Sequence, residues 1–217
     1  MTDPVAFVRR QTRISRPALV PEIRLYLADE MTPIWLATQG ELDDLGVPPP
    51  FWAFCWPGGQ ALTRFILDHP EWVRGKRVLD FAAGSGITAI AAARAGAATV
   101  TAAEIDAHAI AAIALNAELN GATVQIEPGN IVGSHQLAVD VVLAGDICYE
   151  QPMANRVTAW LAGLARDGVT VLMGDPGRSY LPQSGLKELA RYVVPTSTDL
   201  EDSDRRETTI WQLGVRQ

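Results

Sequence analysis

Short apolar runs alternate with longer amphipathic or alanine-rich segments along most of this chain. The apolar runs predict strands at residues 77–81, 99–104, 124–126, 140–144 and 169–173, and a last β-rich run at residues 208–213. The amphipathic segments predict helices at residues 58–68, 87–95, 107–120, 152–165 and 186–192. Strands that alternate with helices form a parallel sheet with right-handed crossovers, so we expect an α/β fold with helices on both faces of the sheet.

The N-terminal part of the chain differs in character from the rest. Four arginines make residues 9–16 basic and weakly amphipathic, which fits either a short surface helix or an organelle transit peptide. Residues 25–50 contain five acidic residues and no lysine or arginine, and they end in three prolines. Because a proline triplet interrupts regular structure, we predict an N-terminal arm at residues 1–50, packed on a core domain at residues 51–217.

Composition narrows the classes of protein. The 217 residues are 48% apolar and 20% charged, which is ordinary for a globular chain. The net charge of −7 argues against nucleic acid or an anionic membrane as a partner, and no apolar stretch reaches membrane-spanning length. Cys55 and Cys148 are too few for a disulfide framework and favour a reducing, cytoplasmic location. The oligomeric state is not indicated.

The turn after the first predicted strand of the core domain carries the clearest chemical signal. Ligands of open α/β sheets bind at the carboxyl ends of the strands. Gly84 and Gly86 follow the strand at residues 77–81, where they let the backbone approach a ligand and open a helix whose first amides face it. The pattern Gly-x-Gly-x-x-Ala, with Glu104 following later in the chain, also fits the relaxed dinucleotide fingerprint and does not by itself identify the nucleotide.

The charge of Asp80, near the end of the same strand, distinguishes a dinucleotide such as NAD from S-adenosylmethionine as the ligand of this turn. A carboxylate beside a pyrophosphate is repelled by roughly several kcal/mol at an effective dielectric near 20, whereas the ammonium and sulfonium of S-adenosylmethionine attract it. The sequence therefore favours S-adenosylmethionine over NAD as the cofactor. The alternative is that Asp80 only caps the next helix.

Polar residues also follow the next two predicted strands. Glu104 ends the second strand, where its carboxylate can accept both ribose hydroxyl protons. Asn130 and Ile131 follow the third strand, where the amide could reach the adenine edge and the isoleucine could cover the ring. For Asn130, a turn residue that tolerates positive φ is an equally good interpretation.

Residues 78–86, together with Glu104, resemble the nucleotide-binding half of the seven-strand S-adenosylmethionine-dependent methyltransferases. The resemblance covers about residues 58–217. It implies S-adenosylmethionine as the methyl donor and a Rossmann-like, seven-stranded, mostly parallel sheet with an antiparallel edge strand, which residues 208–213 could supply.

Three further segments, at residues 50–62, 145–149 and 174–178, resemble the protein-lysine methyltransferases with a Trp-Pro-x-Gly entry segment and an Asp-x-x-Tyr motif. Within that group the chain is most similar to the lysine methyltransferases of the electron transfer flavoprotein β-subunit. Residues 7–37 resemble the same family, which argues against a cleaved leader. The resemblance implies that the substrate is a lysine of the electron transfer flavoprotein β-subunit.

Four residues of these segments have a physical case for a role at the site. Asp146 and Tyr149 lie where the transferred methyl group is expected, and a carboxylate and a phenol can orient a lysine ammonium by charge-assisted hydrogen bonds. Asp146 could instead cap the helix predicted near residue 152. Trp56 and Gly59 could close over the methionyl end of the cofactor, the indole by cation–π attraction.

Two alternatives concern neighbouring positions. Trp52, Phe54 and Trp56 could be core aromatics, and because alternate residues face opposite ways, we expect this for one or two of them. Asp175 and Arg178 lie at the end of the next strand, where the resemblance implies that they face the substrate. Asp-Pro-Gly is also a good turn by itself.

Several other features suggest no further chemistry. The three histidines are scattered without cysteine or acidic partners at ligand spacing, so no metal site is expected. The acidic run at residues 199–204 predicts a solvated loop that could contact a basic peptide. Alternatives to the leading function are a methyltransferase of another protein or of a small amine such as nicotinamide, and a non-catalytic cofactor-binding module.

Overall fold

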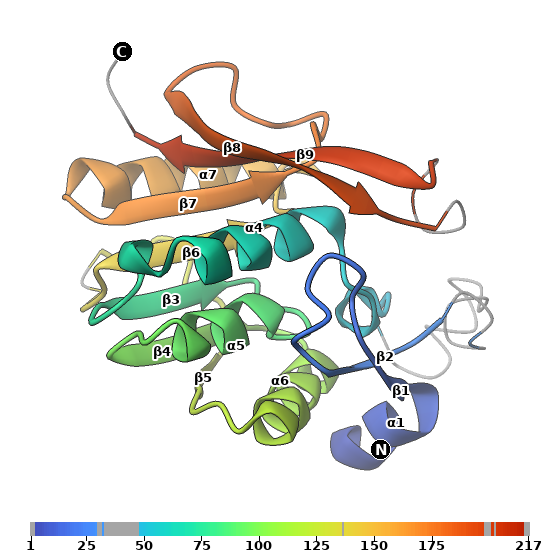
Figure 1. Cartoon of the computed structure of the whole chain (residues 1–217). Helices are drawn as coiled ribbons and strands as arrows, with labels where there is room; N and C mark the ends of the chain where they lie inside the picture. Colours follow the sequence, from blue (N-terminus) through green and yellow to red (C-terminus); the bar gives the residue numbers. More distant parts are fainter. Residues whose placement is uncertain are drawn as a thin grey trace.

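A seven-stranded sheet forms the centre of the molecule in the computed structural model (Figure 1). The model describes residues 3–29, 32, 48–135, 137–197, 201 and 203–214. The strand order is β5-β4-β3-β6-β7-β9-β8, with β9 antiparallel to β7 and β8 and the other pairs parallel. The strands are β3 (Arg77–Phe81), β4 (Thr99–Glu104), β5 (Gln125–Pro128), β6 (Val141–Gly145), β7 (Thr170–Asp175), β8 (Leu186–Pro195) and β9 (Arg205–Leu213). The expected Rossmann-like α/β fold is confirmed.

Helices cover both faces of the sheet (Figure 1). One face carries α4 (Pro57–Asp68), α5 (Ile87–Arg94) and α6 (Ala107–Asn120), and α7 (Met153–Arg166) packs on the other. Two short 3-10 helices, η1 (Phe51–Ala53) and η2 (Pro70–Trp72), flank α4. The cap of α6 follows its sequence, because Asp106 accepts a hydrogen bond from the backbone N of His108 and Gly121 ends the helix at φ 61°.

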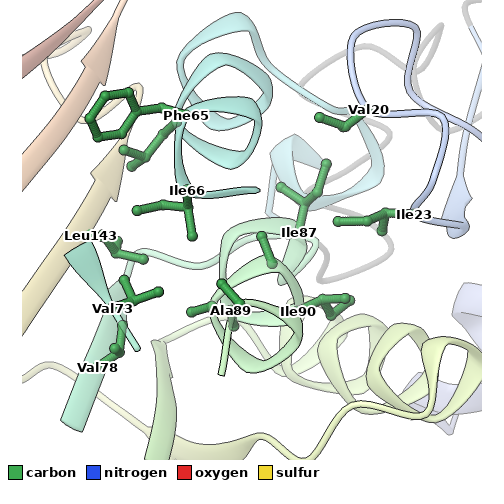
Figure 2. Packing of buried hydrophobic residues seen from close by; sticks show 14 of the residues in the cluster. Val20, Ile23, Phe65, Ile66, Val73, Val78, Ile87, Ala89, Ile90 and Leu143 are labelled. Atoms are coloured by element: carbon green, nitrogen blue, oxygen red, sulfur yellow. The ribbon is translucent and has the colours of Figure 1, made fainter. Parts of the chain in front are cut away.

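The larger core lies between the sheet and the pair α4 and α5. Phe65 and Ile66 of α4, Ile87 and Ile90 of α5 and Leu143 of β6 belong to one cluster, in which Ile66 lies between Phe65 and Leu143 (Figure 2). All five side chains are buried, and burying each one stabilises the fold by roughly 1.5–3 kcal/mol. The helices are thereby fixed over the strand ends that they connect.

The N-terminal arm shares this core. Val20 and Ile23 are fully buried in the same hydrophobic cluster as α4 and α5 (Figure 2). Before them, α1 (Pro4–Gln11) packs its Phe7 and Val8 with residues of α6, and the basic segment therefore begins as a helix. A small hairpin of β1 (Arg13–Ser15) and β2 (Leu25–Leu27) follows. Most of the acidic part of residues 25–50 lies outside the described residues.

The prediction of a helix at residues 186–192 is wrong. These residues belong to β8, which pairs antiparallel with β9 from Leu186 to Pro195 and forms the edge of the sheet. Leu-Lys-Glu-Leu-Ala-Arg has good helix propensity, but pairing along the whole of β9 outweighs a local preference of a few tenths of a kcal/mol per residue.

Glycines bring the start of α4 against the ends of β6 and β7. A Cβ on Gly58 would lie 2.2 Å from the carbonyl O of Gly174, and one on Gly145 would lie 2.8 Å from the backbone N of Gly59. Side chains at these positions would separate the helix from the strands. The first turn of α4 therefore lies directly over the strand ends where ligands bind in this fold.

Gly174→Ala should test how much the fold depends on this contact. The new methyl would lie 2.2 Å from the carbonyl O of Gly58, so we expect the free energy of unfolding to fall by roughly 1–3 kcal/mol in urea denaturation. Gly163→Ala in α7 is the matched control, because its nearest neighbour would be 3.9 Å away, and it should stabilise by about 0.5–1 kcal/mol. An unchanged urea midpoint for Gly174→Ala would contradict the contact.

Candidate active site

Four acidic residues lie at the carboxyl ends of four adjacent parallel strands. Glu104 ends β4, Asp80 is the penultimate residue of β3, Asp146 follows β6, and Asp175 ends β7. Since neighbouring parallel strands end at the same edge of the sheet, the structure brings these predicted residues to one edge.

The turn between β3 and α5 forms a backbone cradle. Ala82, Gly84 and Gly86 have φ of 52°, 53° and 75°, and a Cβ on Gly86 would lie 3.2 Å from the Ile113 side chain. The turn is held in place because Nδ2 of Asn116 donates to the carbonyl O of Ser85 at 2.8 Å. The backbone N atoms of Ala83, Gly84 and Gly86 already donate to Ala103, Glu104 and Ala83, respectively, so a contact between the amides of this turn and a ligand stays a prediction.

Asp80 caps the following helix, which is the alternative interpretation of this residue. Its Oδ2 accepts a hydrogen bond from the backbone N of Ala89 at 2.8 Å, and the side chain is buried. Burial raises the pKa of Asp80 well above its usual value, against the lowering effect of the Ala89 amide. Burial therefore disfavours the charge from which the sequence argument started, and a direct role of Asp80 toward the cofactor stays a prediction.

Glu104 joins the cradle to the next turn. Its Oε2 accepts from the backbone N of Gly84 at 3.0 Å, and its Oε1 accepts from the backbone N of Ile105 and of Asp106 at 2.7 and 3.2 Å. A carboxylate has about four acceptor positions, so Glu104 keeps capacity for a ribose hydroxyl. Ile105, which the sequence did not single out, is 73% exposed beside it.

The residues after β5 have local roles. Oδ1 of Asn130 accepts from the backbone N of Val132 at 3.0 Å, so Asn130 is a turn residue as the alternative interpretation described, although its φ is not positive. Ile131 packs, partly buried, against the core cluster under α7. Contacts of these two residues with adenine stay predictions.

Two of the three aromatic residues before α4 belong to the core. Trp52 and Phe54 are buried with α6, and the Trp52 ring stacks on His108 at 6.3 Å. Trp56 is only partly buried, and its Nε1 donates to the carbonyl O of Phe51 at 2.8 Å. Of Trp52, Phe54 and Trp56, only Trp56 is not buried.

Asp146 is fixed from three sides in a left-handed backbone conformation. Its φ is 54°, and its backbone N donates to the carbonyl O of Gly174 at 3.0 Å. Its Oδ2 accepts from the backbone N of Gly59 at 3.0 Å, and its Oδ1 accepts from Nη2 of Arg178 at 3.0 Å. Asp146 thus caps α4 and not α7, and the predicted residues Asp146, Gly59 and Arg178 are brought together.

The acidity of Asp146 results from opposing effects. Burial raises its pKa to about 6, while Arg178 and the amide of Gly59 lower it and Asp175 raises it. The carboxylate is therefore mostly ionised at neutral pH and loses its charge as the pH falls through about 6.

Asp175 forms a turn, as the alternative interpretation of Asp-Pro-Gly described. Its Oδ1 accepts from the backbone N of Gly177 and of Arg178, both at 2.7 Å. Burial raises the pKa of Asp175, and the two amides and the charge of Arg178 lower it. Asp175 thus positions Arg178, whose guanidinium points to Asp146.

Glu201 is a site residue that the sequence analysis missed. The expectation of a solvated loop at residues 199–204 is wrong for it, because its side chain is 3% exposed and binds Arg178 and Arg206. A single acid within an acidic run shows no pattern that distinguishes a buried partner from a solvated one. Asp199 and Asp202 lie outside the described residues.

Half-exposed aromatic rings lie at the mouth of the site. Tyr149 and Phe51 are each 45% exposed, with ring centroids 5.7 Å apart, and the Phe51 ring lies 6.1 Å from that of Trp56. Burial raises the pKa of Tyr149, and the charges of Glu150 and Glu104 raise it further, so its phenol stays protonated at neutral pH. Phe51 was not predicted, since its role depends on where η1 places it.

Neither a metal-binding cluster nor a membrane-spanning helix is present among the described residues. They contain no group of three or more histidine, cysteine, aspartate or glutamate residues that could hold a metal ion. None of the helices described is long and apolar enough to cross a membrane.

Comparisons with known proteins agree with this geometry. The family model described as ribosomal protein L11 methyltransferase (PrmA) matches residues 62–172. The electron transfer flavoprotein β-subunit lysine methyltransferase of Xenopus laevis is 38% identical over 98% of this chain and 87% of its own length. The protein of that name from Homo sapiens is 39% identical over 95% of this chain and 80% of its own length.

A solved structure shows the same fold. The tRNA (uracil-54, C5)-methyltransferase of Pyrococcus abyssi, in complex with S-adenosyl-L-homocysteine, superposes with a TM-score of 0.53 at 14% identity, over 71% of this chain and 38% of that one. At this identity the likeness concerns the fold alone. By its sequence relatives, the chain belongs to the methyltransferase family that the PrmA model describes and, within it, to the electron transfer flavoprotein β-subunit lysine methyltransferases.

Proposed function

We propose that the protein transfers a methyl group from S-adenosylmethionine to a lysine side chain of the electron transfer flavoprotein β-subunit. The substrate is taken from the relatives that carry this name over nearly the whole chain. The observation that carries the chemistry is the position of Asp146 between the amide of Gly59 and the guanidinium of Arg178, under a mouth of half-exposed aromatic rings.

The residues at the strand ends fit the methyl donor. The cradle of Gly84 and Gly86 would hold the nucleoside part, and Glu104 would accept from one ribose hydroxyl at the acceptor position that its three backbone contacts leave. Trp56, at the start of α4, would cover the sulfonium region. When bound, S-adenosylmethionine supplies an electrophilic methyl group on a positively charged sulfur.

The chain's own residues must then receive a lysine and let it lose a proton. A free lysine has a pKa near 10.4, so its neutral form costs about 4.6 kcal/mol at pH 7. Asp146 captures and orients the ammonium, which favours the charged form, and Tyr149 donates or accepts a hydrogen bond at the mouth. Because the phenol of Tyr149 stays protonated, the proton leaves to water before the transfer.

The exposed mouth favours a polypeptide over a small amine as the substrate. Phe51 and Tyr149 are half-exposed near the loop of Asp146, whose own side chain is only about 10% exposed, and exposed aromatic rings suit contact with a protein surface. The cytoplasmic location and the lack of nucleic-acid or membrane partners are part of the same proposal and rest on charge and cysteine content.

One incubation tests the proposed substrate. Purified protein, methyl-labelled S-adenosylmethionine and the electron transfer flavoprotein should yield label on lysine of the β-subunit, located by mass spectrometry. Ribosomal protein L11, which the family model names, serves as the comparison substrate. If the β-subunit stays unlabelled under conditions that label L11 or another protein, the proposed substrate is wrong. Thermal stabilisation by the cofactor without any label transfer would indicate a non-catalytic binding module.

Asp146→Asn should separate capture of the lysine from binding of the cofactor. Removal of a charge-assisted hydrogen bond costs about 1.5–3 kcal/mol, so we expect kcat/KM for the protein substrate to fall roughly 10- to 100-fold. The Kd of S-adenosylhomocysteine, measured by calorimetry, should change by less than about threefold. Equal losses in both measurements would place Asp146 in the cofactor site.

The pH profile gives a further test of Asp146. Since burial holds its pKa near 6, above the usual value for aspartate, its charge is present above pH 6 and is lost as the pH falls through 6. Below pH 6, log kcat/KM of the wild type should therefore rise with pH at a slope of about two, because both Asp146 and the lysine must lose a proton. Above pH 6 the slope should be about one, because only the lysine must still lose a proton. Asp146→Asn should keep a slope of about one throughout. A profile without this break would show that Asp146 does not act as an ionised group.

A further inference from the structure

Glu201 is a buried acid that reaches the substrate end of the site from the connection between β8 and β9. Its Oε1 lies 2.5 Å from Nη2 of Arg178. Its Oε2 accepts from Nη1 of Arg178 at 3.2 Å and from Nε of Arg206 at 3.1 Å. Its own backbone N donates to the carbonyl O of Ser197 at 2.9 Å. Glu201 is therefore fixed between two guanidinium groups, and it partly neutralises both.

Arg178 is shared between Glu201 and Asp146. The Nη2 atom that contacts Glu201 also donates to Oδ1 of Asp146 at 3.0 Å. A guanidinium that faced Asp146 alone would neutralise this carboxylate and repel an incoming ammonium. Because Arg178 makes two contacts with Glu201 and one with Asp146, much of its charge is directed away from the carboxylate that must bind the lysine.

Acids outnumber guanidinium groups around Asp146 in the part of the chain that the structure describes. There, the ionisable groups that face Asp146 or its partners are Cys55, Cys148, Asp175, Arg178, Glu201 and Arg206. Burial raises the pKa of both thiols, which therefore stay neutral. The carboxyl groups of Asp146, Asp175 and Glu201 face the guanidinium groups of Arg178 and Arg206, so the described cluster has more acids than bases.

We propose that Glu201 is a positioning residue that holds Arg178 partly away from Asp146 and so keeps one negative charge available for the ammonium of the target lysine. This inference rests on the proposed function and assigns Glu201 to the capture of the substrate, with no contact to the methyl donor.

Glu201→Gln tests the proposal with the electron transfer flavoprotein as the substrate. With no charge to share, Arg178 should turn to Asp146, and we expect KM for the flavoprotein to rise roughly tenfold, while KM for S-adenosylmethionine changes less than about twofold. Glu201→Asp, which keeps the charge, should recover most of the loss. Glu207→Gln is the matched control. It removes an exposed acid of β9 that pairs with Arg191 of β8, and it should leave both KM values unchanged.

Arg206→Gln provides a change of opposite sign. In this variant Glu201 loses one of its two guanidinium partners and attracts the remaining one, Arg178, more strongly. KM for the flavoprotein should therefore stay the same or fall. In an NMR titration of the Asp146 carboxyl carbon, the pKa should move down in Glu201→Gln, by about one unit, and up in Arg206→Gln. Damage to the fold would not move the two variants in opposite directions, and Arg206→Gln carries the test if Glu201→Gln does not fold.

The titration needs no substrate, so it separates this proposal from the proposed function. If the wild type does not methylate the flavoprotein, the proposed substrate is wrong, but the opposite shifts of the Asp146 pKa still support the electrostatic part of the proposal. Equal shifts in both variants, no shift in either, or an unchanged KM for the flavoprotein in Glu201→Gln would overturn the role of Glu201.

Discussion

The contact between the first turn of α4 and the ends of β6 and β7 is the constraint on which the site depends. Gly58 and Gly174 meet so closely that a Cβ on either would lie 2.2 Å from the other's carbonyl O. This approach brings the backbone N of Gly59 to Oδ2 of Asp146 and helps to hold that residue at φ 54°, a conformation that costs about 1–3 kcal/mol outside glycine. The orientation of the Asp146 carboxylate is thus a consequence of helix packing.

The same packing sets the electrostatics of the site. Burial under α4 raises the pKa of Asp146, and without Arg178 this carboxylate would be less ionised at neutral pH. A fully paired Asp146, however, would have little attraction left for a cationic substrate. The shared position of Arg178, between Asp146 and Glu201, meets both requirements, since it supports ionisation without complete neutralisation.

Local sequence signals predicted the parts of the molecule that local physics determines. The strand at Arg77–Phe81 and the helix at Ala107–Asn120 were predicted with their observed limits, because an apolar run marks the strand, a terminal glycine ends the helix, and both signals act within a few residues. The helix expected at residues 186–192 failed because pairing with β9 decides that segment, and the solvated loop failed at Glu201 because Arg178 and Arg206 bind its carboxylate in the folded chain. Both errors arise from contacts that no local pattern contains.

Asp80 shows that a residue predicted to bind a ligand can also have a structural role. The sequence argument gave this residue a charge that would welcome a cationic donor, yet burial favours its neutral form and Ala89 already occupies Oδ2. Glu104, beside the cradle, and Asp146, after β6, add two further carboxyl groups to the same edge of the sheet. The preference for a positively charged ligand over a pyrophosphate therefore belongs to the whole row of strand ends. A row of acids on adjacent strands repels a phosphate more than a single acid does, and the direct role of Asp80 toward the cofactor stays a prediction.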